Sequence, residues 1–184
     1  MAEPNPEELF NRGEDILNFA LKGGGGTFRP DSLEAKEYYV QAKEYFEKAC
    51  ELNYAKGCVN LGSLYQGEGL VIGEKNPRLK ERLEKAVQYY SKACDLNYKF
   101  GCSWLGAMQY QGKVVVKNEK QAMKKFEKAC KLGYKEVCEM VTYKGLCELG
   151  HKEACEIFSL EVLCRLSDLK ACGMSYDKRK ALGF

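Results

Sequence analysis

The chain of 184 residues carries 29 basic and 26 acidic side chains, for a formal net charge of +3. Charges of both signs are interspersed, which gives no case for a nucleic acid or a membrane surface as partner. No apolar run approaches the roughly 18 residues of a membrane-spanning helix. The start, "MAEPNPEELF", is acidic and lacks the apolar core of a secretion signal.

A run of four glycines at 23–26 is the first distinctive element. No Gly-Lys-Ser or Gly-Lys-Thr follows it, so the pattern does not indicate a phosphate-binding loop. We interpret the run as a flexible connector.

All ten cysteines then fall into five units of the form C-x7-C, beginning with "CELNYAKGC" at 50–58. Leu follows two positions after each first cysteine, and the next residue is Asn, Gly or Ser. Gly and Asn tolerate the left-handed conformation that closes a helix. Each unit therefore predicts the turn of a helical hairpin, with Leu as the last buried residue of the first helix.

The residues before each unit predict that first helix. Ala or an aromatic residue recurs eight, four and one positions before the cysteine, and these steps trace one apolar helix face. The residues are Ala42, Phe46 and Ala49, then Ala86, Tyr90 and Ala93, then Ala122, Phe126 and Ala129. Second helices follow the first two units, with Gly62 and Gly106 as points of close helix contact and ends at Gly67 and Gly112.

The spacing of the units predicts the domain organisation. Cys94 and Cys130 are 36 residues apart, whereas Cys130, Cys147 and Cys164 follow at steps of 17. A single repeat domain over 1–184 is expected, because an array has no internal domain boundary. Its parts are repeat 1 at 35–70, repeat 2 at 79–113, repeat 3 at 118–143, compressed single short helices at 144–172, and a tail at 173–184.

The cysteines indicate disulfides and an oxidising compartment, secreted or periplasmic, with the secretion signal presumed absent from this chain. The hairpin geometry predicts that each unit closes on itself. The pairs are Cys50–Cys58, Cys94–Cys102, Cys130–Cys138, Cys147–Cys155 and Cys164–Cys172. Zinc is the rival, but structural zinc sites use cysteines two to four apart, and His151 is the only histidine. We expect no metal and no cofactor.

The stretches "AKEYFEKACELNYAKGCVNLGSLYQGEG" and "AVQYYSKACDLNYKFGC" resemble SEL-like repeats, relatives of the tetratricopeptide repeat. With a cysteine at each hairpin end, the chain resembles the Helicobacter cysteine-rich protein family. The resemblance implies an all-α solenoid of disulfide-stapled hairpins that is preceded by an N-terminal helix, here at 7–22. It implies two functions: a secreted interaction module, or a beta-lactamase or penicillin-binding activity.

Two Ser-x-x-Lys matches, at Ser167–Lys170 and Ser175–Lys178, bear on the enzyme hypothesis. This number is close to what chance gives for the composition, and neither Ser-Asp-Asn nor Lys-Thr-Gly occurs. We assign no catalytic residue. We expect the protein to be a monomer that binds a protein or peptide partner, including a partner from a host.

The predicted binding site is a stripe on the first helices, which line the concave groove in tetratricopeptide relatives. It consists of Tyr38, Gln41 and Tyr45, then Arg82, Lys85 and Tyr89, then Asn118, Gln121 and Lys125. Tyrosines among polar and basic groups suit peptide recognition. The alternative, that these tyrosines pack between repeats, stays open.

Overall fold

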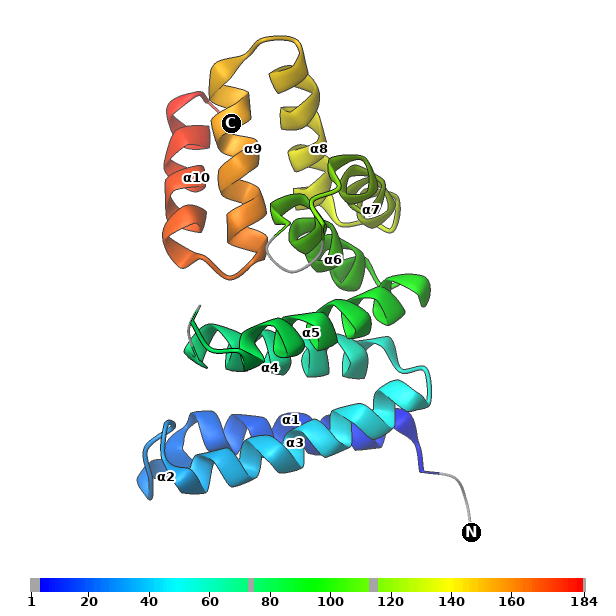
Figure 1. Cartoon of the computed structure of the whole chain (residues 1–184), viewed down its shortest axis with the longest axis vertical. Coiled ribbons are helices and arrows are strands. Elements are labelled where there is room, and N and C mark those ends of the chain that lie inside the picture. The colour runs from blue at the N-terminus through cyan, green and yellow to red at the C-terminus, as the bar shows by residue number, and fades with distance from the viewer. Residues whose placement is uncertain (1–3, 73–74, 113–115, 184) are drawn as a thin grey trace. The chain divides into compact units, whose positions relative to one another are not determined.

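The computed structural model describes residues 4–72, 75–112 and 116–183, and these residues form helices and connecting turns (Figure 1). The helices are α1 Pro6–Leu21, α2 Gly23–Gly26, α3 Leu33–Glu51, α4 Ala55–Ile72, α5 Arg78–Asp95, α6 Lys99–Gln111, α7 Glu119–Lys131, α8 Lys135–Glu148, α9 Lys152–Arg165 and α10 Leu169–Ala181. The all-α class predicted from the sequence is confirmed. The chain divides into two compact units, Met1–Leu96 and Asn97–Phe184.

In the N-terminal unit, α1 packs against α3 and α4 packs against α5. In the C-terminal unit, α6 packs against α7, and α8, α9 and α10 lie side by side in chain order. Each neighbouring pair buries an apolar stripe that neither helix could bury alone.

Each C-x7-C unit closes a helix in the way the sequence predicts. The residue three after the first cysteine has a left-handed backbone, with φ of 60° at Asn53 and Asn97, 93° at Gly133, 96° at Gly150 and 70° at Ser167. The Asn53 amide donates to the Cys50 carbonyl at 2.9 Å, and the Tyr54 amide donates to the Ala49 carbonyl at 3.0 Å. This pair of bonds is the Schellman motif, which satisfies carbonyls at a helix end.

Disulfides join the two helices at these turns. The pairs Cys50–Cys58, Cys130–Cys138, Cys147–Cys155 and Cys164–Cys172 have Cα atoms 4.6 to 4.7 Å apart. Cys94 and Cys102 are disulfide-bonded as well. The four described pairs are those that the hairpin argument predicts.

The leucine of the unit is not the last buried residue, so that prediction was wrong. Leu52 is 41% exposed and Leu149 is 79% exposed. Both are C-cap residues. At this position the chain leaves the helix axis, so the side chain no longer points along the buried stripe.

The buried stripes of the first helices are as predicted. All nine predicted stripe residues on α3, α5 and α7 are at most 1% exposed. A Cβ at Gly62 would lie 2.7 Å from the Tyr90 ring, and a Cβ at Gly106 would lie 2.9 Å from the Phe126 ring. The same arrangement joins Gly13 of α1 to Phe46 of α3, at 2.7 Å. The sequence analysis missed this third glycine because no cysteine unit precedes α1.

One other prediction needs correction. Helix α4 continues past Gly67 to Ile72, because a glycine in a helix interior weakens the helix without ending it. Gly112, in contrast, ends α6 with φ of 66°. The four glycines at 23–26 all have a left-handed backbone, and a Cβ at Gly23 would lie 2.3 Å from the Phe28 carbonyl oxygen. That this run is a flexible connector stays a prediction.

The C-terminal segments are helical throughout most of their length. The two helices predicted as short, α8 and α9, have 14 residues each, about as long as α6 and α7 with 13. The predicted tail, which begins at residue 173, is helical as far as Ala181, where α10 ends.

Candidate functional site

A cluster of aromatic and basic side chains gathers on α3, α4 and α5 of the N-terminal unit. We call it the Tyr65 surface. It comprises Lys43 from α3, Tyr65 and Glu68 from α4, and Arg82, Lys85 and Tyr89 from α5. The Tyr65 and Tyr89 rings stack with centroids 5.7 Å apart and an interplanar angle of 9°. Both rings remain partly exposed, so this site has aromatic area to offer a partner.

Three cations surround the Tyr65 ring. The Lys43 Nζ atom lies 4.7 Å from the ring centroid, the Lys85 Nζ atom 5.2 Å, and the Arg82 guanidinium carbon 5.6 Å. Cations within about 6 Å of an aromatic face are attracted by its quadrupole. The ring therefore helps to hold three like charges in one small area.

Carboxylates partly neutralise this charge. The Glu68 Oε1 atom is 2.6 Å from Lys43 Nζ, and the Glu68 Oε2 atom is 3.1 Å from Arg82 Nη1. Lys85 pairs with Glu81 of its own helix at 3.5 Å, where both side chains are well exposed. An exposed pair of that kind contributes little.

Tyr89 is held in its neutral form. Its hydroxyl donates to Glu47 Oε1 at 3.4 Å. Partial burial, together with the nearby Glu47 carboxylate, raises the pKa of Tyr89 to about 12. At neutral pH Tyr89 therefore keeps the proton that it donates to Glu47.

The structure brings together three of the predicted stripe residues, Arg82, Lys85 and Tyr89. Tyr38 instead stacks on Phe28 at 5.6 Å and meets the edge of Phe19 at 5.1 Å, so it belongs to a packing cluster at the end of α1. Tyr45 is partly buried, with Lys48 Nζ 5.8 Å from its centroid, and Gln41 is exposed.

The remaining stripe residues lie in the C-terminal unit. Asn118 is the N-cap of α7, and its side chain accepts from the Gln121 amide at 3.0 Å. Lys125 is partly buried on the same helix. A role of these residues in binding stays a prediction.

Sequence reasoning missed Lys43, Tyr65 and Glu68. It placed the site on first helices alone, whereas Tyr65 and Glu68 belong to the second helix α4. Helical spacing could have indicated two of them. Tyr65 lies three residues after Gly62, and Glu68 lies three residues after Tyr65, so the three share one face of α4. Gly62 packs against α5.

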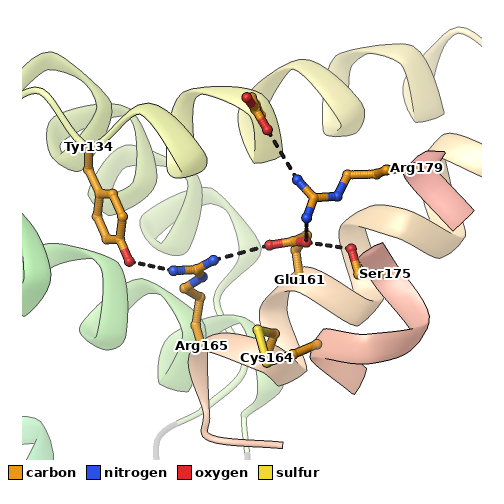
Figure 2. A network of polar contacts seen from close by, with 8 residues as sticks. Tyr134, Glu161, Cys164, Arg165, Ser175 and Arg179 are labelled. Atoms are coloured by element: carbon orange, nitrogen blue, oxygen red, sulfur yellow. Dashed lines mark hydrogen bonds and ion pairs between the residues drawn. A yellow bond between two sulfur atoms is a disulfide. The ribbon is translucent and has the colours of Figure 1, made fainter. Parts of the chain in front are cut away.

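The C-terminal unit contains a second polar cluster, centred on the buried carboxylate of Glu161 in α9 (Figure 2). Glu161 accepts a hydrogen bond from Ser175 of α10 and pairs with Arg165 at 3.2 Å and with Arg179 at 3.7 Å. Arg165 in turn donates to the Tyr134 hydroxyl. Because these contacts join α9 and α10 and satisfy a buried charge, they fasten the last helix to its neighbour.

The two serines of the Ser-x-x-Lys matches occupy structural positions. The Ser175 side chain is fully buried and donates a hydrogen bond to Glu161, while Lys178 pairs with Glu156. Ser167 is the left-handed residue of a helix-closing turn. Ser175 is therefore not the exposed nucleophile that acyl transfer to a lactam requires.

Within residues 4–72, 75–112 and 116–183, no helix is long and apolar enough to span a membrane. In the same ranges, His, Cys, Asp and Glu side chains do not gather in threes that could hold a metal ion.

Comparisons with known proteins place these features in a family. The model of the Sel1 repeat matches residues 19–44, 36–54, 55–98 and 100–134. Of the curated relatives, "Putative beta-lactamase HcpC" of Helicobacter pylori is 41% identical over 71 residues, covering 38% of this chain and 19% of the relative. "Beta-lactamase HcpA" of the same species is 36% identical over 74 residues, covering 40% and 22%. The matches thus span about a fifth of these relatives.

Two solved structures are also similar. Helicobacter pylori cysteine rich protein B is 36% identical, with 74% of this chain and 97% of that chain covered and a TM-score of 0.46. A protective antigen of uropathogenic Escherichia coli with an SLR fold is 19% identical, with 84% and 30% covered and a TM-score of 0.51, a likeness of fold alone. The repeat matches extend over more than half of the sequence. The chain therefore belongs to the Sel1 repeat family, with Helicobacter cysteine-rich proteins among its relatives.

Proposed function

We propose that this protein is an interaction module of an oxidising compartment, secreted or periplasmic, that binds an extended segment of a protein partner at the Tyr65 surface. Sel1 repeats are typical of proteins that mediate protein interactions. The disulfides favour a location outside the cytoplasm, where thiols are kept oxidised.

The observation that carries the proposal is the pair of partly exposed rings of Tyr65 and Tyr89 with Arg82 beside them. Tyrosine and arginine are the residue types most enriched among those that dominate binding energy at interfaces. The Tyr89 hydroxyl, which donates to Glu47, can still accept a hydrogen bond from a peptide amide, and the Tyr65 ring offers apolar contact to peptide side chains.

The scaffold beneath the surface is rigid. The disulfide Cys50–Cys58 ties α3 to α4, and the buried Tyr90 ring fills the notch at Gly62 between α4 and α5. Helices that are already fixed lose little entropy when a ligand binds, which favours affinity. Gln41 and Tyr45 of α3 belong to the predicted stripe and lie outside the Tyr65 surface as defined above. We propose that they contact the bound segment as well.

The lactamase names of the relatives are not carried over to this chain, because Ser167 and Ser175 occupy the structural positions described above. We expect no turnover of a chromogenic cephalosporin above a heat-inactivated control. Turnover that is lost in Ser167→Ala or Ser175→Ala would support the enzyme hypothesis instead.

Selection of random dodecapeptides by display against the oxidised protein tests the proposal. We expect enriched peptides that bind in solution and lose at least about fivefold in affinity on Tyr65→Ala. The matched control is Tyr176→Ala, which removes a 57% exposed tyrosine from α10 and should leave binding unchanged. No enrichment, or equal loss in both variants, would contradict the proposed function.

A further inference from the structure

We infer that the segment bound at the Tyr65 surface carries acidic side chains, and that Glu68 is a built-in competitor for the cations that would recognise them. The inference rests on the proposed function, and it adds the chemical class of the partner.

The first argument is the charge balance around the Tyr65 ring. Three cations lie within 6 Å of its centroid. Lys43 belongs to α3, which precedes α4 in the sequence, and Arg82 and Lys85 belong to α5, which follows it. One carboxylate, Glu68, bridges two of them. Lys85 contacts Glu81 in the exposed pair described above. The three cations around the ring are thus contacted by two carboxylates, Glu68 and Glu81, which leaves one positive charge in excess that a further carboxylate would complement.

The second argument concerns how Glu68 holds its partners. Lys43 is 16% exposed in its side chain and Arg82 is 28% exposed, so both are partly desolvated, which strengthens their attraction to a carboxylate. Arg82 meets Glu68 through Nη1, and a guanidinium has five N–H donors in a planar fork. An incoming carboxylate can thus reach Arg82 and Lys85 beside Glu68, or replace Glu68 on Arg82.

The third argument favours an acidic peptide over a polyanion such as a nucleic acid. Glu47, Glu68 and Glu81 all contact residues of the Tyr65 surface. A phosphate backbone has a charge at every step and would meet these carboxylates. A peptide can place one or two acidic residues at the cations and rest its apolar atoms on the tyrosine rings.

The experiment measures the affinity of one selected acidic dodecapeptide and of its amide version, with every Glu changed to Gln and every Asp to Asn. We expect the acidic peptide to bind at least about tenfold more tightly to the wild type. Arg82→Gln should weaken binding of the acidic peptide by a larger factor than binding of the amide version, so that most of this preference is lost. Glu68→Gln should tighten binding of the acidic peptide about three- to tenfold, because the competing carboxylate is gone.

Lys80→Gln is the matched control for Arg82→Gln. Lys80 lies on the same helix, is 76% exposed and pairs with Glu84, so its loss should change neither affinity. Selected peptides that bind equally well in acidic and amide form would overturn the inference and leave the proposed function standing. Weaker binding of the acidic peptide to Glu68→Gln would also overturn it, as would an Arg82-dependent affinity for single-stranded DNA equal to that for the acidic peptide.

Discussion

Helices α3 and α5, which carry much of the core of the N-terminal unit, are 19 and 18 residues long, whereas those of the C-terminal unit have 13 or 14. The cross-links differ as well: among the described disulfides, three lie wholly in the C-terminal unit and one in the N-terminal unit. We infer that the C-terminal unit depends more on cross-links, and the N-terminal unit more on the packing of long helices.

Reduction of the disulfides should have the largest effect on the difference in stability between the two units. Each closed loop of about nine residues contributes about 2.6 kcal/mol in the chain-entropy model, so three contribute about 8 kcal/mol. We expect amide hydrogen exchange after reduction to show loss of protection in α8, α9 and α10 before loss in α3 and α4. Earlier loss in the N-terminal unit would contradict the assignment of cross-links as the main support of the C-terminal unit.

Removal of the Glu161 side chain should have the next largest effect on stability. Glu161→Ala leaves the buried Ser175 hydroxyl and two mostly buried guanidinium groups without their shared carboxylate. Loss of one partner from a buried ion pair costs about 3 kcal/mol or more of unfolding free energy. Chemical denaturation checks the value. Glu148→Gln, which neutralises a 67% exposed carboxylate 3.9 Å from Lys144, should change stability by less than about 0.5 kcal/mol.

A glycine substitution tests the packing of the N-terminal unit. In Gly62→Ala the added Cβ would lie 2.7 Å from the buried Tyr90 ring, and such overpacking costs about 1 to 3 kcal/mol. Gly67→Ala in the same helix meets nothing within 4 Å and should stabilise by up to about 1 kcal/mol through helix propensity. Equal effects of both changes on the denaturation midpoint would mean that the notch at Gly62 is not tightly filled.

The smallest expected effect is on the alkaline stability of the N-terminal unit. The folded state raises the pKa of Tyr89 to about 12 from its ordinary 10, chiefly through burial. The protonated form is therefore favoured in the folded state, and this contribution is complete below pH 10 and is lost as pH rises through 12. We expect Tyr89→Phe to flatten the fall in melting temperature between pH 10 and 12. An unchanged slope would contradict the assignment.

The turns and the buried stripes were predictable because ten cysteines in one spacing mark equivalent positions in every repeat. Asn53 and Gly133 could be assigned a left-handed backbone from residue type alone. The Tyr65 surface was predicted in part: Arg82, Lys85 and Tyr89 follow from the spacing of the first helices. Tyr65 and Glu68 were missed, because their place depends on the rotation of α4 against α5, which the fit of Gly62 to Tyr90 determines. Glu161 was missed for a similar reason: nothing in the sequence distinguishes a buried glutamate from the many solvated ones on helix surfaces.

The most direct test of binding by the N-terminal unit measures affinity and melting temperature together in the double variant Tyr45→Ala/Tyr89→Ala. We predict that binding of a selected peptide weakens by more than about 1 kcal/mol, while helicity and melting temperature stay close to those of the wild type. Unchanged binding with a much lower melting temperature would show that these rings serve packing, and would contradict the account.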